Sequence, residues 1–200
     1  MGGPREQPGG SRAVAREAVK AHVSNTARTL VLERGYEAIS VEAICSAAEI
    51  SRSTFFRYFA SKEDAVLTDI EEAAETLRSA LSARPGDEPV WTAVHRALEP
   101  LVEQYDASPE PARPLAALTA TTPALAAYQH EKHSAWRDAL RPEICRRIGV
   151  DPADHTDPRP TAILAAALAC LDAAITAWAT TEQTTPISAL LRAAMDSTRL

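Results

Sequence analysis

Hydrophobic residues recur along most of the chain at the spacing of an α-helix. Val23, Ala27 and Val31 follow one another at intervals of four residues, so they share one face of a helix expected over residues 12–34. Gly35 marks the expected end of this helix, because glycine readily adopts the left-handed conformation that closes a helix.

The same periodicity, together with residues that begin and end helices, predicts eight more helices. They are expected at about residues 41–48, 52–59, 61–83, 89–106, 112–120, 123–148, 159–181 and 186–197. Ser40, Ser51 and Ser61 are the expected caps of three of them, and Gly149 is the expected end of another. Pro142 lies inside the sixth of these and should kink or split it, because proline lacks the N–H that a helix interior needs. Only three of the seven glycines lie beyond residue 10, and alanine and leucine are abundant. The sequence therefore predicts an all-α fold of about nine helices.

Charge is distributed unevenly along the chain. The formal net charge of −6 by itself argues against binding to nucleic acid. Residues 1–64, however, hold nine Lys/Arg and eight Asp/Glu, whereas residues 65–200 hold twelve and nineteen. Residues 1–11 are rich in glycine and proline and are expected to form a disordered arm, made basic by Arg5 and the adjacent Arg12. The excess of acidic residues is thus confined to residues 65–200, and a nucleic acid would bind the N-terminal part of the chain.

Residues 43–59 fit a helix-turn-helix. A four-residue turn, residues 48–51, separates two short helices, and Ile50 and Phe55 are placed to point inward and lock them together. A recognition helix must be held rigidly in this way to enter the major groove of DNA. The side chains left outward on the second helix supply guanidinium groups for guanine edges, hydroxyl groups for phosphates and a methyl group for thymine: Arg52, Ser53, Thr54, Arg57 and Tyr58. Three packed helices with no DNA-binding role would show a similar pattern.

Four motifs in order identify a family resemblance. They are Glu33-Arg34-Gly35-Tyr36, Ser40-Val41-Glu42-Ala43-Ile44, Ile50-Ser51-Arg52-Ser53-Thr54-Phe55-Phe56-Arg57-Tyr58-Phe59 and Ser61-Lys62-Glu63-Asp64. Together they closely resemble the DNA-binding domain of the tetracycline-repressor (TetR) family. The resemblance implies an all-helical homodimer that represses promoters by binding a double-stranded DNA operator and releases it when a small-molecule effector binds.

The same resemblance assigns DNA contacts to particular residues. The family's base-reading and phosphate-holding positions, with the capped start of the preceding helix, correspond to Ser40, Val41, Arg52, Ser53, Thr54, Phe56, Arg57, Tyr58 and Lys62. Two positions depart from the family pattern. Glu49 stands where the turn usually has glycine, and Phe56 replaces a tyrosine whose hydroxyl group would bind a phosphate. The segment from Ser51 to Asp64 also resembles mycofactocin-associated regulators, some of which sense acyl-coenzyme A.

These expectations divide the chain into residues 1–11 as a basic arm, 12–64 as a DNA-binding domain and 65–200 as a helical ligand-binding and dimerisation domain. In the last region, aromatic, apolar and acidic side chains are candidates to line an effector cavity: Trp91, Leu98, Tyr105, Tyr128, Trp136, Asp172, Ile175 and Trp178. The two last helices are the expected dimer interface, through Leu168, Leu171, Leu190, Leu191 and Met195.

Asp172 lies in the middle of an apolar, alanine-rich run, residues 162–179, where a carboxylate needs a compensating partner. Two alternatives stay open: it pairs with an Arg or a Trp N–H in the core, or it faces the cavity and selects a polar or cationic ligand. The charge also favours a buried helix of a soluble protein over a membrane span. With no apolar leader and three scattered cysteines, the sequence predicts a cytoplasmic protein without membrane contact.

No motif for catalysis or for a cofactor stands out, and we expect neither. His130 and His133 share a helical face, but a metal site needs further ligands, so we expect none. Two other functions remain possible from the sequence alone. One is a helical carrier or sensor of hydrophobic molecules that does not touch DNA, and the other is an enzyme on a helical scaffold. Retention on a DNA column that depends on salt would separate the regulator from the carrier.

Overall fold

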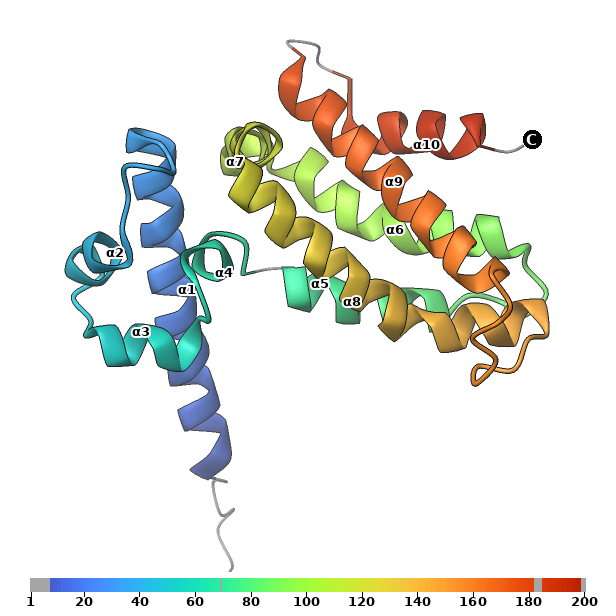
Figure 1. Ribbon diagram of the computed structural model, residues 1–200, viewed down its shortest axis with the longest axis horizontal. Coiled ribbons are helices and arrows are strands. Elements are labelled where there is room, and N and C mark those ends of the chain that lie inside the picture. Colours follow the sequence, from blue (N-terminus) through green and yellow to red (C-terminus); the bar gives the residue numbers. More distant parts are fainter. Residues whose placement is uncertain (1–7, 69, 182–184, 199–200) are drawn as a thin grey trace, which may run out of the picture. The chain divides into compact units, whose positions relative to one another are not determined.

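The computed structural model describes residues 8–68, 70–181 and 185–198, and these residues form ten α-helices and no strand. The helices fall into two compact units, residues 1–68 and residues 69–200. The first holds α1 to α4 and the second α5 to α10 (Figure 1). The fold is thus all-α, as the sequence predicts, with one helix more than the nine expected.

The N-terminal unit consists of one long helix and three short ones. They are α1 (Pro8–Arg34), α2 (Val41–Ala47), α3 (Arg52–Tyr58) and α4 (Lys62–Val66). Helix α1 begins four residues before the expected start, and the rest of the predicted arm, residues 1–7 with Arg5, lies outside the described residues. Ser40, Ser51 and Ser61 cap the short helices, because each hydroxyl group accepts a hydrogen bond of 3.1–3.2 Å from the N–H three residues on.

Two side chains of α1 hold the end of α4. The Ser24 hydroxyl donates to the carbonyl of Ala65 at 2.7 Å, and Arg28 Nε donates to the carbonyl of Val66 at 2.9 Å. These carbonyls stand at the C-terminal end of a five-residue helix, where no further turn can satisfy them. The expected single helix over 61–83 is therefore two helices, since α4 ends at Val66 and α5 begins at Ile70.

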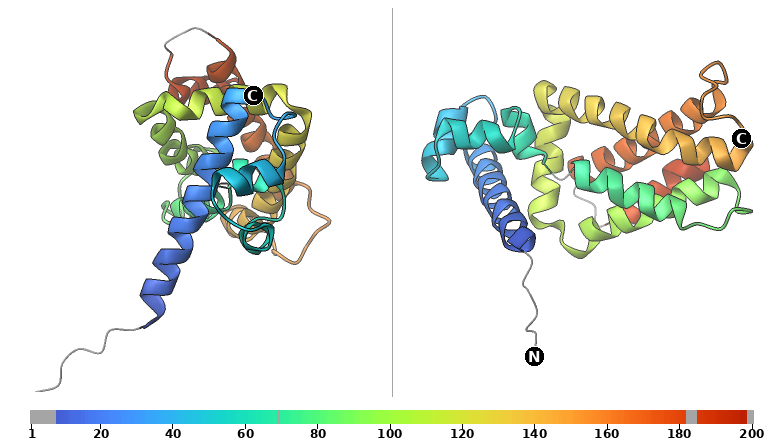
Figure 2. Two further views of the ribbon diagram at one scale, coloured as in Figure 1. Left: turned by 90° about the vertical axis from the view of Figure 1, so that its left-hand side faces the viewer. Right: turned by 90° about the horizontal axis from the view of Figure 1, so that it is seen from below.

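The C-terminal unit is a bundle of six helices. They are α5 (Ile70–Ser82), α6 (Val90–Ala107), α7 (Pro109–Thr121), α8 (Pro123–Ile148), α9 (Arg159–Thr180) and α10 (Ile187–Ser197). Helix α9 packs against α7, α8 and α10, and α5 packs against α6 and α8. Figure 2 shows the helices of this unit from two further directions. Helix α8 continues past Pro142, so the expected split does not occur. Gly149 closes it in the left-handed conformation, with φ 70°.

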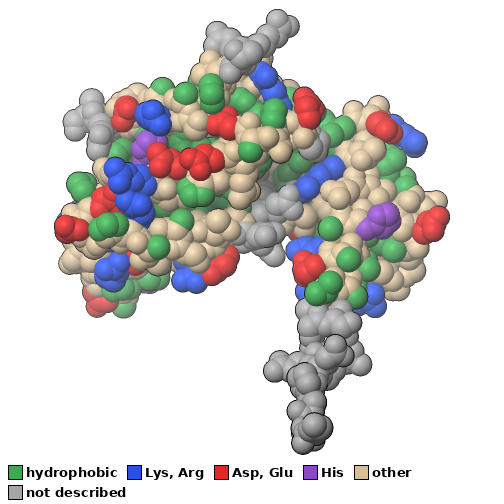
Figure 3. All heavy atoms as spheres, turned by 180° about the vertical axis from the view of Figure 1, so that it is seen from behind, with side chains coloured by type: hydrophobic (Ala, Val, Ile, Leu, Met, Phe, Trp, Pro, Cys, Tyr) green, Lys and Arg blue, Asp and Glu red, His purple; other side chains and the backbone are tan. Residues whose placement is uncertain are grey.

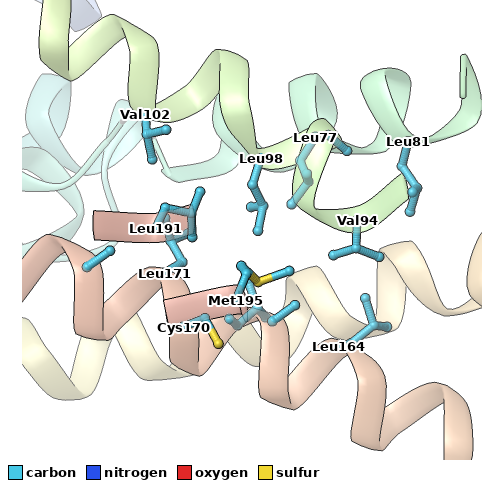
Figure 4. Packing of buried hydrophobic residues seen from close by; sticks show 14 of the residues in the cluster. Leu77, Leu81, Val94, Leu98, Val102, Leu164, Cys170, Leu171, Leu191 and Met195 are labelled. Atoms are coloured by element: carbon cyan, nitrogen blue, oxygen red, sulfur yellow. The ribbon is translucent and has the colours of Figure 1, made fainter. Parts of the chain in front are cut away.

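The core of this unit is built from leucines and other apolar side chains that meet between α5, α6, α9 and α10 (Figure 4). Leu77, Leu98 and Leu171 are each at most 2% exposed. Helix α9 is long and apolar enough to cross a membrane by length and composition alone. Its buried side chains, however, belong to this core, so it has the role of a central helix of the bundle.

Arg147 ties α8 to the end of α5. Its side chain is 1% exposed, and its guanidinium group donates to the carbonyls of Leu81, Arg84 and Pro85 at 2.8–2.9 Å. It also pairs with Glu143 one turn earlier, at 2.8 Å. A single cation thus satisfies carbonyls that the C-terminal end of α5 and the following turn leave without helical partners.

Candidate DNA-binding surface and effector region

Helix α3 is held by aromatic side chains on its inner face. Phe55 of α3 and Phe59, which caps the C-terminal end of α3, are at most 1% exposed, and their ring centroids lie 5.4 Å apart. From α2, Ile44 and Cys45 are buried in the same interior, which joins the two helices of the predicted helix-turn-helix. Ile50, expected to be an inward lock, is half-buried. The inner face of α3 therefore fixes the direction in which its outer face points.

The turn before α3 carries backbone strain. Glu49 has φ 54°, the left-handed conformation that glycine adopts without cost and that costs other residues about 1 kcal/mol. The N–H of the next residue, Ile50, donates to the carbonyl of Cys45 at 2.9 Å, so the turn keeps its closing hydrogen bond. Glu49 thus adopts the left-handed conformation at the turn position where the family resemblance leads us to expect glycine.

The outer face of α3 carries cationic, hydroxyl and aromatic side chains. Arg52, Ser53, Phe56 and Arg57 are exposed, and Thr54 and Tyr58 are half-buried. The Arg57 guanidinium lies 5.0 Å from the centroid of the Tyr58 ring. Of the other residues expected to contact DNA, Ser40 is exposed at the cap of α2 and Val41 is half-buried beside it.

Arg52 has an acidic partner that the sequence analysis did not identify. Its guanidinium lies 2.8 Å from the carboxylate of Glu42, and both side chains are more than half exposed. Hydrogen bonds from its own backbone N–H and from Ser40, followed by the nearby Arg52 charge, lower the pKa of the Glu42 carboxyl. Glu42 therefore stays ionised at neutral pH and competes with any other anionic group for the Arg52 guanidinium.

Lys62 lies within hydrogen-bonding distance of its own unit's backbone. Its ammonium group donates to the carbonyls of Tyr36 at 2.9 Å and Ile39 at 2.8 Å, and it lies 3.6 Å from the centroid of the Tyr36 ring. The Tyr36 hydroxyl in turn donates to Glu63, and burial, followed by this carboxylate, raises the pKa of Tyr36. Lys62 was expected to hold a phosphate, but two of its three N–H groups already donate hydrogen bonds to carbonyls in the segment between α1 and α2.

The residues expected to line one effector cavity lie in different parts of the C-terminal unit. Leu98, Trp136 and Trp178 are at most 5% exposed and belong to the core. Tyr105 packs against Trp178, with 6.0 Å between ring centroids, and Ile175 borders the same core. Tyr128 is half-buried on α8 and lies beneath the Lys132 ammonium, 5.2 Å from its ring centroid.

Asp172 is paired with side chains of α8. One carboxylate oxygen lies 3.3 Å from Nδ1 of His133, and the other accepts a hydrogen bond of 3.0 Å from the Gln129 side chain. His133 is 7% exposed, and its ring centroid is 4.9 Å from that of Trp136. The carboxylate thus has protein partners, although neither is the Arg or Trp N–H that the sequence suggested.

Trp91 lies apart from the other candidates, beside α10. Its indole N–H donates to the carbonyl of Met195 at 3.1 Å. It borders a surface pocket of about 290 Å³ between α6 and α10, lined by Trp91, Thr92, His95, Arg96, Glu99, Arg192, Met195 and Asp196. Charges of both signs meet in this pocket, and Figure 3 shows Lys/Arg and Asp/Glu side chains similarly mixed over the C-terminal unit.

The expected dimer residues lie mostly inside their own chain. Leu168, Leu171, Leu191 and Met195 are at most 5% exposed and pack in the core of the unit, and Leu190 is partly buried against it. For the four buried side chains the expected surface shared with a partner is therefore corrected, whereas for the partly buried Leu190 it stays a prediction. The solvent-facing sides of α9 and α10 instead carry small and charged residues: Ala162, Ala169, Ala173, Ala189, Arg192, Ala193 and Asp196.

Metal-binding and redox groups form no cluster in the described part of the chain. No group of three or more His, Cys, Asp or Glu side chains that could hold a metal ion occurs there. Cys45, Cys145 and Cys170 are free and buried. His130, which shares a helix with His133, is exposed.

Comparisons with known proteins agree with this architecture. Residues 24–68 match the family of bacterial regulatory proteins called the tetR family, and residues 88–199 match the MftR C-terminal domain. The transcriptional regulator TcmR of Streptomyces glaucescens is 34% identical over 138 residues, which cover 65% of this chain and 60% of TcmR. The mycofactocin biosynthesis regulator MftR of Mycobacterium tuberculosis is 28% identical over 133 residues, 66% of this chain and 67% of MftR.

Solved structures share the fold at low sequence identity. FadR of Thermus thermophilus, a TetR-family repressor in complex with lauroyl-CoA, superposes with a TM-score of 0.56 at 18% identity, covering 88% of this chain and 91% of that one. The matched segment spans about 60% of the length of TcmR, so similarity to that relative concerns part of it. The matched family consists of transcriptional regulators and not of enzymes. With its N-terminal helix-turn-helix and its C-terminal domain both matched, the chain belongs to the TetR family of bacterial transcriptional regulators.

Proposed function

We propose that this regulator binds an operator as a homodimer through α3 and leaves it when a lipid-like effector binds the C-terminal unit. The observation that carries the DNA-binding part is the two-sided character of α3. Phe55 and Phe59 are buried on one side, and Arg52, Ser53 and Arg57 are exposed on the other. A short helix braced in this way can enter the major groove, where guanidinium groups bond guanine and hydroxyl groups bond phosphate.

The dimer follows from the symmetry of such sites. Two copies of α3 would read two half-sites about one helical turn of DNA apart, so we expect a palindromic operator. The exposed sides of α9 and α10 support a dimer because Ala169, Ala173 and Ala193 are small enough for close approach of two helices. Ala169→Arg should therefore produce a monomer that keeps its helical content, measured by light scattering during size exclusion and by circular dichroism. An unchanged dimer mass would place the interface elsewhere.

The proposed effector is a largely apolar molecule with a polar head, with acyl-coenzyme A as the first candidate. Its support is the match to the MftR C-terminal domain and the shared fold with a FadR that binds lauroyl-CoA. Within this chain, the half-buried Tyr105, Tyr128 and Ile175, with the paired Asp172, remain the proposed lining residues. An effector can release the operator only to the extent that it binds the released form more tightly.

The DNA-binding part is tested with duplexes selected from a random library by the purified full-length protein. Arg52→Ala and Arg57→Ala should each weaken binding by about 5- to 100-fold in fluorescence anisotropy, since a base or phosphate contact is lost. The matched control is Arg78→Ala, whose partner Glu75 lies on the same helix of the C-terminal unit. Affinity for DNA that does not fall with rising salt would instead support a carrier without DNA binding.

The effector part is tested by adding lauroyl-CoA, stearoyl-CoA or coenzyme A alone to the complex of protein and selected DNA. The acyl thioesters should release the DNA at lower concentrations than coenzyme A does, because only they bring an apolar chain to bury. Equal effects of all three would show that the acyl chain is not recognised. As a DNA-binding regulator of bacterial genes, the protein would act in the cytoplasm.

A further inference from the structure

We propose that Phe56 reads the methyl group of a thymine in the operator, an inference that rests on the proposed binding of DNA by α3. Phe56 is 49% exposed, and together with Val14 it is one of two large apolar side chains that are exposed among the described residues. It lies in the middle of α3, on the outer side of the helix. The apolar group that the resemblance places where a phosphate-binding tyrosine is usual therefore faces outward.

The Phe56 ring is held from two sides. The buried Phe55 ring meets it at right angles, with 5.3 Å between centroids and 84° between planes. The Arg52 guanidinium lies on its face, 5.6 Å from the centroid, while also paired with Glu42. Phe55 is itself fully buried, so it provides a fixed support. The Phe56 ring is thus presented in a defined orientation, as a group that reads a base must be.

The chemistry of the ring determines what it can recognise. Its exposed neighbours Ser53, Arg52 and Arg57 offer hydrogen-bond donors and hydroxyl groups, which suit phosphates and the acceptor atoms of bases. The Phe56 ring offers neither a donor nor a strong acceptor. In the major groove the one apolar group on a base edge is the C5-methyl of thymine. The ring would therefore bind an A·T pair whose thymine methyl points toward α3, and would lose contact area against cytosine.

Arg52 and Phe56 are four residues apart and lie on one side of α3. Four residues rise about 6 Å along a helix, which is roughly two base-pair steps of DNA. A guanidinium and a ring at this spacing would contact base pairs next to one another or one step apart. The recognised thymine should thus lie within about two base pairs of the site that Arg52 contacts.

The test replaces each thymine of the selected operator by deoxyuridine, which removes the methyl group and leaves base pairing unchanged. We expect one thymine in each half-site to respond, with affinity lowered about fourfold for one half-site and about 15-fold for both, as expected for one and two buried methyl groups. The Phe56→Ala variant should bind the operator with thymine and the operator with deoxyuridine with equal affinity. Phe56→Leu should keep part of the preference, because an apolar side chain remains.

Control variants make the result specific. Val14→Ala removes the other exposed apolar side chain and should leave the thymine preference unchanged. Circular dichroism checks that Phe56→Ala is folded, which its exposed position predicts. If no thymine responds while Arg52→Ala and Arg57→Ala still weaken binding, the role of Phe56 is refuted and the DNA-binding proposal stands. A preference that survives in Phe56→Ala would assign the methyl contact to another side chain. If the protein selects no duplex at all, both proposals fail.

Discussion

Replacing Arg147 with methionine should destabilise the C-terminal unit strongly. The side chain is 1% exposed, and its guanidinium serves the carbonyls of Leu81, Arg84 and Pro85 as well as the Glu143 carboxylate. Methionine has a similar length and restores much of the packing, so the change tests the charge and its hydrogen bonds and not the volume.

The expected loss can be worked from these partners. Removing one member of a buried ion pair costs about 3–5 kcal/mol, because the remaining charge is left without compensation. Glu143 keeps a second partner, since Arg146 lies 2.5 Å from it, and this favours the lower end of that range. The carbonyl of Arg84, in the turn after α5, also loses the donor that Arg147 provides. We therefore expect a loss of about 3 kcal/mol, which lowers the midpoint of thermal unfolding by roughly 10 °C.

The assay is thermal and urea unfolding followed by tryptophan fluorescence at one protein concentration. Trp91, Trp136 and Trp178 all lie in the C-terminal unit, so the signal reports that unit. Arg146→Met is the matched control, because Arg146 pairs with the same Glu143 but is 56% exposed, and it should change the midpoint little. Equal midpoints for the two variants would refute the reasoning that burial makes the Arg147 contacts important.

Three further changes test other contacts. Glu42→Gln should free Arg52 from its carboxylate partner and remove a negative charge near the DNA. The affinity for unrelated duplexes should therefore rise several-fold, and the ratio of the dissociation constants for unrelated and selected duplexes should fall. Glu49→Asn should raise the free energy of unfolding by up to about 1 kcal/mol, because asparagine tolerates φ 54° better than glutamate does; a lower value in urea denaturation would contradict this. Hydrogen bonding from Arg146 first, and then from a second arginine, lowers the pKa of Glu143 below its ordinary 4.5. The ionised Glu143 carboxylate therefore stabilises the fold above pH 4.5, and this contribution is lost as the pH falls. In Glu143→Gln the free energy of unfolding, measured between about pH 5 and 2, should depend less on pH.

Much of the fold could be predicted because its signals are local. Ser40, Ser51 and Ser61 cap helices where the sequence places caps, and Gly35 and Gly149 adopt the left-handed conformation where it places helix ends. A hydroxyl group that satisfies the N–H three residues on needs no distant partner. Helix ends of this kind can therefore be predicted from the local sequence, because they do not depend on residues far away in the chain.

The break between α4 and α5 could not be predicted in the same way. Residues 61–83 have the composition of one helix, and no glycine or proline interrupts them. The carbonyls that end α4 are instead satisfied by Ser24 and Arg28, about 40 residues earlier in the chain. Only the packing of α1 against α4 brings these donors to that point, and periodicity within one segment does not contain this information.

The same difference between local signals and long-range packing separates the candidate sites that could be predicted from those that could not. The outer face of α3 could be predicted, because the sequence places Phe55 on the inner face, and Phe55 is buried there. The dimer residues could not, because an apolar helix face is equally suited to a partner chain and to the chain's own core. Leu171 and Met195 face the core. The partner of Asp172 is likewise set by the packing of α9 on α8, which brings His133 beside it.

Helices α4 and α5 are each bonded to another helix of their own unit. Helix α4 is bonded at its end by Ser24 and Arg28 of α1, so α4 moves with the N-terminal unit. Helix α5 is bonded at its far end by Arg147 of α8, so that end moves with α8. An effector that shifts α8 should therefore also displace the end of α5 that Arg147 holds.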